Sequence, residues 1–289
     1  MSKATTQWTD PVAYLRQALT LDQFTLYCQP IAALSGVVVY PMAEVLIRLR
    51  EEERALLPPG DFLPILEHYG MMPELDRWVV REVVRRLSNG PEIARFCVNL
   101  SSQTIADPAF PDFFANEIFA YGVSADSVMF EVDEADALAL PSCMRRFSAT
   151  VGSLGTGILI DGFGRADNYA EGLKLPCVQY VKIHGSLTRR IGADEAAAAK
   201  VAALLRLVAQ HGIAVVAECV EDDDVIAKLR ALKVRYAQGF GICVPQSIDL
   251  VSELPVMRLA VQGSLDFGNQ AREGVWQHAN ASTAARPRA

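Results

Sequence analysis

The feature that most constrains the fold is a repeated alternation of short apolar runs with helical patterns. The apolar runs have the length and the β-branched or aromatic content of buried strands. Strands are predicted at residues 24–31, 37–49, 96–100, 128–133, 158–161, 180–184, 214–220 and 236–240, and helices at 12–19, 61–69, 74–87, 110–121, 144–154, 194–211 and 222–232. Strands that alternate with helices form a mostly parallel sheet, and this many units in one chain favour an α/β barrel.

One stretch concentrates the chemistry. The apolar run 158–160 leads into Asp161 and then into two glycines, Gly162 and Gly164. A short run that ends in glycine is typical of a buried strand, so Asp161 is predicted at its carboxyl end. The glycines let the following loop approach a ligand closely.

Other predicted strands also carry a polar residue near the carboxyl end. The set is Glu44, Asn99, Glu131, Asp161, Lys182, Glu218 and Gln238. In a parallel barrel these ends meet at one face, so residues far apart in sequence converge there. Carboxylate and amide oxygens suit Mg²⁺ or Mn²⁺ rather than zinc. Any one of these residues alone is explained as an ordinary solvated or capping side chain, but the whole set indicates a site.

Composition excludes several classes of protein. The chain has 289 residues, of which 51% are hydrophobic and 21% charged, so a large core is expected and global disorder is excluded. The net charge of −7 argues against a nucleic-acid polymer as partner. No apolar run approaches the ~20 residues of a membrane span, and the start of the chain has no signal-peptide pattern. Six cysteines without a C-x-x-C pair indicate reduced thiols. We therefore expect a soluble, cytoplasmic protein.

Eight short motifs occur in order along the chain. They are Q-P-I at 29–31, E-V-L-I-R at 44–48, V-N-L-S at 98–101, F-E-V-D-E at 130–134, D-G-F-G at 161–164, K-I-H at 182–184, A-E-C-V-E at 217–221 and Y-A-Q-G-F at 236–240. In content and spacing the set resembles the EAL domain family, which hydrolyses or binds the bacterial second messenger cyclic di-GMP. The resemblance extends from about residue 19 to residue 245.

The resemblance implies a TIM-like (β/α)8 barrel with an antiparallel first strand, and it implies roles for the motif residues. The ligands of a first Mg²⁺ or Mn²⁺ ion match Glu44, Asn99, Glu131 and Asp161, and ligands of a second ion match Asp161 and Glu218. The catalytic positions of the family match Lys182 and Glu221. The positions that hold or border the dinucleotide match Gln29, Leu46, Arg48, Gln238 and Phe240. An arginine suits a phosphate, and an aromatic ring can stack on a base.

The chain departs from the family pattern at the D-D-F-G motif. Gly162 replaces the second aspartate and has no side chain with which to bind metal. The following loop, usually T-G-Y-S-S, reads R-A-D-N-Y at 165–169, which affects a segment that the family uses for metal binding and dimerisation. His184 and Asp133 replace an aspartate and a threonine. Either could serve as a substitute ligand, although simple space-filling and local hydrogen bonds are favoured.

Three functional hypotheses follow. A degenerate EAL domain binds cyclic di-GMP and acts on a partner protein with little or no hydrolysis, and this hypothesis is preferred because of Gly162 and the altered loop. The alternatives are an active phosphodiesterase that produces pGpG, and an interaction protein that no longer binds nucleotide. A homodimer is compatible with each of them. The predicted organisation is a leading helix at 1–20, the EAL domain at 21–255 and a loosely ordered tail at 256–289.

Overall fold

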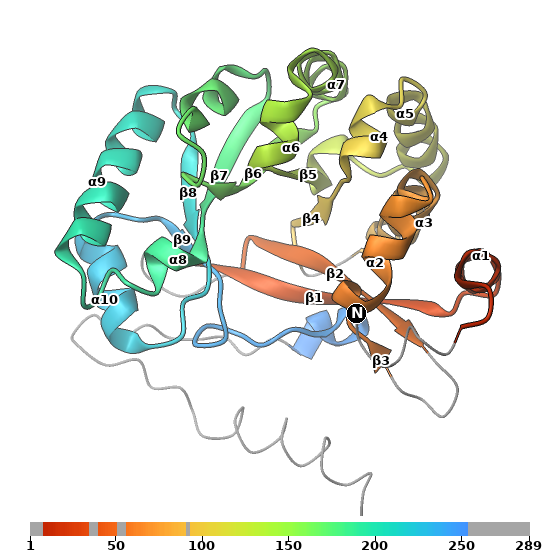
Figure 1. The fold of residues 1–289 in the computed structure, drawn as a ribbon, viewed down its shortest axis with the longest axis horizontal. Helices are drawn as coiled ribbons and strands as arrows, with labels where there is room; N and C mark the ends of the chain where they lie inside the picture. The colour runs from red at the N-terminus through yellow and green to blue at the C-terminus, as the bar shows by residue number, and fades with distance from the viewer. Residues whose placement is uncertain (1–7, 35–39, 51–55, 91–92, 254–289) are drawn as a thin grey trace, which may run out of the picture.

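A computed structural model describes residues 8–34, 40–50, 56–90 and 93–253, in which eight strands close into a barrel with helices around it (Figure 1). The strands are β1 (Phe24–Ala33), β2 (Met42–Arg50), β3 (Leu56–Leu57), β4 (Arg95–Asn99), β5 (Val128–Asp133), β6 (Gly157–Phe163), β7 (Val178–Ile183), β8 (Ala214–Ala217), β9 (Tyr236–Ala237) and β10 (Gln246–Ser247). The helices are α1 (Pro11–Thr20), α2 (Pro59–His68), α3 (Met72–Leu87), α4 (Ser102–Ala106), α5 (Phe110–Tyr121), η3 (Ala125–Ser127), α6 (Glu134–Ala139), α7 (Pro141–Ser153), η4 (Tyr169–Lys174), α8 (Gly185–Thr188), α9 (Glu195–Gln210), α10 (Asp223–Ala231) and η5 (Ile248–Glu253).

The barrel is mixed rather than all parallel. Strand β1 pairs antiparallel with β2 on one side and with β9 on the other, which closes the barrel. From β2 through β4 to β9, neighbouring strands of the barrel are parallel. The short strands β3 and β10 extend β2 and β1 outside this closure. The structure thus confirms the TIM-like barrel with an antiparallel first strand.

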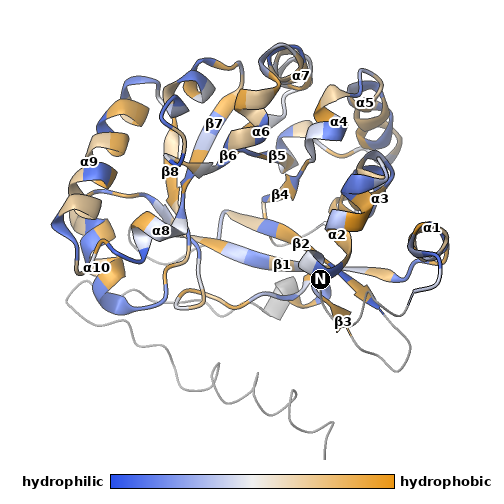
Figure 2. Ribbon diagram, in the orientation of Figure 1, coloured by the Kyte–Doolittle hydropathy of each residue, from blue (hydrophilic) through white to orange (hydrophobic). Residues whose placement is uncertain are grey.

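Local sequence signals account for the helix ends and for the outer layer. Asp10, Asp194 and Asp222 accept hydrogen bonds from backbone N–H groups at the starts of α1, α9 and α10, as N-cap residues do. Figure 2 shows that α3 and α9 carry both hydrophobic and hydrophilic residues along their length. Their apolar faces bury residues such as Val80 and Leu204 between helices and strands.

Some expected elements differ from the structure. The strand predicted at 214–220 ends at Ala217, because Cys219 adopts a left-handed backbone with φ of 56° that cannot continue a strand. The last strand, predicted at 236–240, is only Tyr236–Ala237. Residues 37–39 of the second predicted strand and the predicted tail at 256–289 lie outside the described residues.

All six cysteines are free, with Cys28 and Cys97 buried. In the described residues, no helix has the length and apolar character needed to cross a membrane.

Candidate functional site

The barrel interior explains why the polar residues of the motifs converge. An apolar cluster fills the inside of the barrel and comprises Ile31, Met42, Cys97, Met129, Leu159 and Val216, with Tyr180 and Tyr236 packed against it. Along each parallel strand the functional residue comes two positions after its member of this cluster. Five of these residues lie on strands, Glu44, Asn99, Glu131, Asp161 and Lys182, and two come directly after β8 and β9, Glu218 and Gln238. Residues i and i+2 of a strand lie on the same face. A polar layer therefore lies directly above an apolar one.

The antiparallel first strand obeys the same geometry in reverse. On β1 the functional residue, Gln29, comes two positions before the apolar cluster member Ile31. The reversed order is required because β1 runs opposite to its neighbours.

Glu44 corrects the expectation that every site residue ends its strand. It is the third residue of β2, which continues for six more residues to Arg50. The reason is that β2 pairs with β1 far beyond the region where it pairs with β4. Leu46 and Arg48 lie on this extension, past the polar layer.

Lys182 is the centre of the polar layer. Its ammonium nitrogen Nζ lies 3.0 Å from Oε2 of Glu44 and 3.9 Å from Oδ1 of Asp161, and it donates a hydrogen bond to Oε1 of Glu131. The Lys182 side chain is only 1% exposed. A buried ammonium of this kind is stable only where carboxylates surround it.

Amide side chains complete the network around Glu44. Asn99 donates to Oε1 of Glu44 at 3.0 Å, and Gln238 donates to Oε2 at 2.7 Å. Nε2 of Gln238 also lies 3.2 Å from Oε1 of Gln29, whose own amide donates to the backbone carbonyl of Cys243. The structure therefore joins four predicted residues, Gln29, Glu44, Asn99 and Gln238, in one hydrogen-bonded set.

The carboxylates respond differently to this environment. Burial raises the pKa of Glu44, but the charge of Lys182 and the hydrogen bonds from Asn99 and Gln238 outweigh it, and the net pKa is lowered. Burial and then the charge of Glu44 hold the pKa of Glu131 well above its ordinary value. Burial lowers the pKa of Lys182, but the charges of Glu131 and Glu44 raise it well above the ordinary value. The carboxylates around the one ammonium of Lys182 therefore differ in how readily each gives up its proton.

The residues predicted for a first metal ion supply donor atoms of the kind that a hard cation prefers, in an arrangement that now holds an ammonium. Oε2 of Glu131 and Oδ1 of Asp161 are buried and have no hydrogen-bond partner among the described residues. With Glu44 and Asn99 they form an oxygen donor set, which Mg²⁺ and Mn²⁺ prefer. The described residues contain no ready-made metal cluster of three acidic, histidine or cysteine side chains, and the Lys182 ammonium lies among the carboxylates instead.

The residues predicted for a second ion do not fit one. Oε1 of Glu218 accepts a hydrogen bond from the backbone N–H of Gly185, at the start of α8. Burial, followed by the charge of Asp161, raises the pKa of Glu218. Gly162 contributes no side chain, and the guanidinium of Arg165 lies over it. The second site thus lacks a carboxylate and has a cation beside it.

Three of the remaining predicted residues lie outside the buried network. Glu221 is exposed and lies 3.5 Å from Nε of Arg189. The ring of Phe240 is 68% exposed, just after β9. The guanidinium of Arg48 lies 5.5 Å from the ring centroid of Tyr27 and donates to the backbone carbonyl of Ile47. More than half of the surface of Glu221 and of Phe240 is accessible to solvent, as contact with a ligand requires.

The two possible substitute ligands make local contacts. Nδ1 of His184 lies 2.8 Å from Oγ of Ser186 and caps α8. Asp133 caps α6 and pairs with Arg165. These contacts agree with the favoured expectation that both residues have local structural roles.

Sequence reasoning assigned no role to Glu134, which holds the loop after β6. The carboxylate is buried and accepts hydrogen bonds from the backbone N–H groups of Gly164, Arg165 and Ala166, at 2.8, 3.0 and 2.8 Å. The sequence signal that could have indicated this role is the position of Glu134, an acidic residue directly after β5 in the 130–134 motif. Such a residue can reach the next strand's loop, because β5 and β6 are neighbours.

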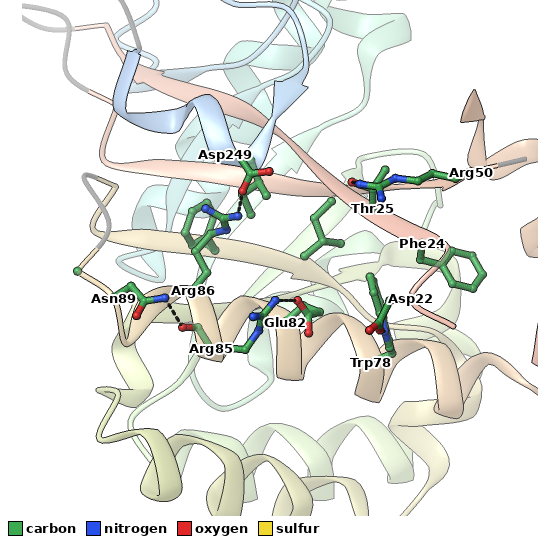
Figure 3. A pocket seen from close by; sticks show the side chains of 14 residues that line it. Asp22, Phe24, Thr25, Arg50, Trp78, Glu82, Arg85, Arg86, Asn89 and Asp249 are labelled. Atoms are coloured by element: carbon green, nitrogen blue, oxygen red, sulfur yellow. Dashed lines mark hydrogen bonds and ion pairs between the residues drawn. The ribbon is translucent and has the colours of Figure 1, made fainter. Parts of the chain in front are cut away.

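A separate cavity of about 520 Å³ lies between β1, β4, α3 and η5 (Figure 3). It contains none of the predicted site residues. Two of its arginines pair with acids, Arg85 with Glu82 and Arg86 with Asp249, as Figure 3 shows. Its charges are thus largely balanced, and the polar layer remains the better candidate site.

The model of the EAL domain matches residues 12–245. The chain belongs to the EAL domain family. Among curated relatives, it is 30% identical to the cyclic di-GMP phosphodiesterase PdeF of Escherichia coli over 84% of this chain and 33% of the relative. It is 28% identical to the cyclic di-GMP phosphodiesterase PdeB of Shewanella oneidensis over 85% of this chain and 29% of the relative. The chain thus spans about a third of the length of these relatives.

Solved structures show the same fold. The FimX EAL domain of Pseudomonas aeruginosa bound to c-di-GMP superposes with a TM-score of 0.77 at 26% identity, over 82% of this chain and 96% of that domain. A complex of the PaMucR phosphodiesterase with c-di-GMP gives a TM-score of 0.76 at 27% identity, over 83% and 99%. Both of these solved structures contain c-di-GMP.

Proposed function

We propose that this chain binds cyclic di-GMP at the mouth of its barrel and hydrolyses it little or not at all. One observation carries the proposal. The network of Lys182, Glu44, Glu131 and Asn99 is complete, whereas the next position along β6, Gly162, has no side chain and is covered by Arg165. The chain keeps the residues around one cation position and lacks those for two.

The residues proposed to hold the dinucleotide offer three kinds of contact. Arg48 supplies a guanidinium that matches a phosphate. Phe240 presents an exposed ring on which a guanine can stack. Leu46 is proposed to border the same mouth and offers an apolar contact. The amides of Gln29 and Gln238 are buried and hydrogen-bonded to each other, so they would support the mouth from below.

Mg²⁺ or Mn²⁺ would be held by Glu44, Asn99, Glu131 and Asp161. A divalent ion held there supplies positive charge that activates water and stabilises the charge that develops on phosphate. Lys182 and Glu221 are the proposed catalytic residues. Lys182 orients the carboxylates and a water between them, but its ammonium stays protonated because the surrounding acids raise its pKa. It is therefore a poor proton acceptor.

An active phosphodiesterase producing pGpG is the second candidate. The two unpartnered oxygens of Glu131 and Asp161 favour it, because they offer ligands for a metal ion. The name of the E. coli relative is in accord with it. A cytoplasmic protein that acts on a partner protein, alone or as a homodimer, is compatible with either candidate, and loss of nucleotide binding would leave that interaction role alone.

Titration calorimetry with cyclic di-GMP tests the proposal. Binding is expected in EDTA as well as with Mg²⁺, and the Arg48→Ala variant should bind about ten times more weakly or worse, as expected for a lost charge-assisted contact. Absence of binding up to high micromolar nucleotide in both buffers would contradict the proposal and favour an interaction-only protein.

A further inference from the structure

Gly162 and Arg165 occupy one space. Gly162 has a left-handed backbone with φ of 67°, and a Cβ atom built there would lie 2.9 Å from Cζ and Nε of Arg165 and 3.0 Å from Nη2. These separations are shorter than normal van der Waals contacts. The guanidinium therefore lies directly over Gly162, in the space where another residue at this position would begin its side chain.

The guanidinium is held in place from β5. Nη2 of Arg165 lies 2.5 Å from Oδ2 of Asp133, and Oδ1 of Asp133 accepts the N–H of Ala135. The backbone N–H of Arg165 donates to Glu134, so the side chain and the main chain are both anchored by adjacent acids. The Arg165 side chain remains 40% exposed. It is thus a positioned cation that still faces solvent.

Acidic side chains outnumber buried cations at the mouth. Glu44, Glu131, Asp161 and Glu218 are four acidic groups that act on the one ammonium of Lys182. Lys182 is buried and already surrounded by acids, so its charge is not available to a ligand. A phosphodiester that approaches without a metal ion meets repulsion unless another positive group lies nearby.

Arg165 has donors to spare for this purpose. A guanidinium carries five N–H donors in a planar fork. Among the described residues, the contact to Asp133 is the one side-chain hydrogen bond of Arg165. The other donors belong to a side chain that is 40% exposed and so are open to a ligand from the solvent side.

We infer that Arg165, in the space that Gly162 leaves open, binds a phosphate group of the dinucleotide and makes binding independent of a second metal ion. The inference rests on the proposed function and names the residue that makes it possible. Gly162 and Arg165 then act as a pair, since a side chain at 162 would displace the guanidinium.

Calorimetric titration of cyclic di-GMP in EDTA tests the inference on four proteins: wild type, Arg165→Ala, Arg165→Lys and Arg145→Ala. Arg145 is an exposed arginine on α7 and serves as the matched control. Arg165→Ala should weaken binding about ten- to a hundredfold, the range of charge-assisted hydrogen bonds. Arg165→Lys keeps the charge but loses the fork, so it should restore part of the affinity. Arg145→Ala should bind as the wild type does.

Gly162→Ala supplies an independent second variant. The added methyl group pushes the guanidinium away, so this variant should lose affinity as Arg165→Ala does. Adding Gly162→Ala to Arg165→Ala should cause little further loss, because the two changes remove the same contact. Equal and additive losses would overturn the pairing of the two residues.

The outcomes separate this inference from the function on which it rests. If the wild type and Arg165→Ala bind cyclic di-GMP with the same affinity, the role of Arg165 is overturned and the proposed function stands. An equal loss in Arg145→Ala would also overturn it, since the effect would then reflect overall charge. No binding by the wild type in EDTA or in Mg²⁺ would overturn both. If Arg165→Ala does not fold, the comparison of Arg165→Lys with the wild type decides alone.

Discussion

Lys182 shows how much of this site depends on a single residue. The side chain is buried among three carboxylates, and each of them would be left without its counter-charge if the ammonium were removed. The position was predictable from the K-I-H motif and from its place two residues after the inward-facing Tyr180. The contact of Lys182 with Glu44, 138 residues away in the chain, required the fold.

Replacement of Lys182 by methionine should therefore destabilise the protein strongly. Breaking a buried ion pair by removing one partner typically costs about 3–5 kcal/mol, and we expect a loss of that order in urea unfolding at about pH 8. Burial already raises the pKa of Glu131, and without Lys182 its pKa should rise further. Glu131 can then take up a proton as the pH falls, so the loss should be smaller at about pH 5.

Lys174→Met is the matched control, because Lys174 is exposed and, among the described residues, pairs only with Glu171, one turn earlier. Surface changes of this kind usually alter stability by less than about 0.5 kcal/mol. If Lys182→Met lowers the free energy of unfolding by the same amount at both pH values, uncompensated carboxylates are not the cause of the destabilisation.

At the scale of elements, helix α3 fixes the turn that carries Asn99. Asp76 on α3 accepts three hydrogen bonds at Oδ2, from the backbone N–H of Ser101 at 3.0 Å, from its hydroxyl at 2.8 Å and from the hydroxyl of Thr104 at 2.6 Å. Ser101 is also the N-cap of α4. The V-N-L-S motif predicted the strand end at Asn99, but the partner on α3 had no signal in the sequence.

The titration of Asp76 gives an element-scale prediction. Burial raises the pKa of Asp76 to about 6, and the hydrogen bonds from Thr104 and Ser101 only partly offset this rise. A raised carboxyl pKa stabilises the fold below the unfolded value of about 3.9 and loses this contribution as the pH rises through about 6. The stability of the wild type relative to Asp76→Asn should therefore fall between about pH 4.5 and about pH 6.5 in urea unfolding and stay level above that.

Asp107→Asn provides the contrast for this experiment. A hydrogen bond from Arg77 lowers the pKa of Asp107, so its contribution is already complete above pH ~4 and is lost only in stronger acid. The difference between the wild type and Asp107→Asn should stay flat over the same pH interval. A flat profile for Asp76→Asn as well would contradict the raised pKa.

For the whole molecule, the alternation of apolar runs and helical patterns was sufficient to predict a barrel, because burial of both sheet faces imposes that pattern along the entire chain. The reversal of β1 followed only from the family resemblance, since an apolar run does not encode its direction. The convergence of the polar residues was predictable because the carboxyl ends of parallel barrel strands meet at one face. The placement of Arg165 over Gly162 was not predictable, because it depends on a loop held by Glu134 and on an ion pair with Asp133.

The proposed separation of nucleotide binding from hydrolysis depends on one position, residue 162. Two-metal hydrolysis uses ions ~3.5–4 Å apart that together stabilise the in-line displacement. In this chain the four residues proposed for a first ion, Glu44, Asn99, Glu131 and Asp161, are all present, and at the adjacent position Gly162 lies beneath the guanidinium of Arg165. Loss of one electrostatic group at a transition state commonly costs about a hundred- to a thousandfold in rate, and loss of an ion should cost at least as much.

The most direct test is a single-turnover assay. Excess protein is incubated with cyclic di-GMP in Mg²⁺ and in Mn²⁺, and pGpG is followed by chromatography for the wild type, Gly162→Asp and Gly162→Asp combined with Arg165→Ala. The wild type should return the nucleotide intact, and Gly162→Asp alone should gain little because its side chain meets Arg165. The double variant should form the most pGpG of the three. Rapid and complete conversion to pGpG by the wild type would contradict the account.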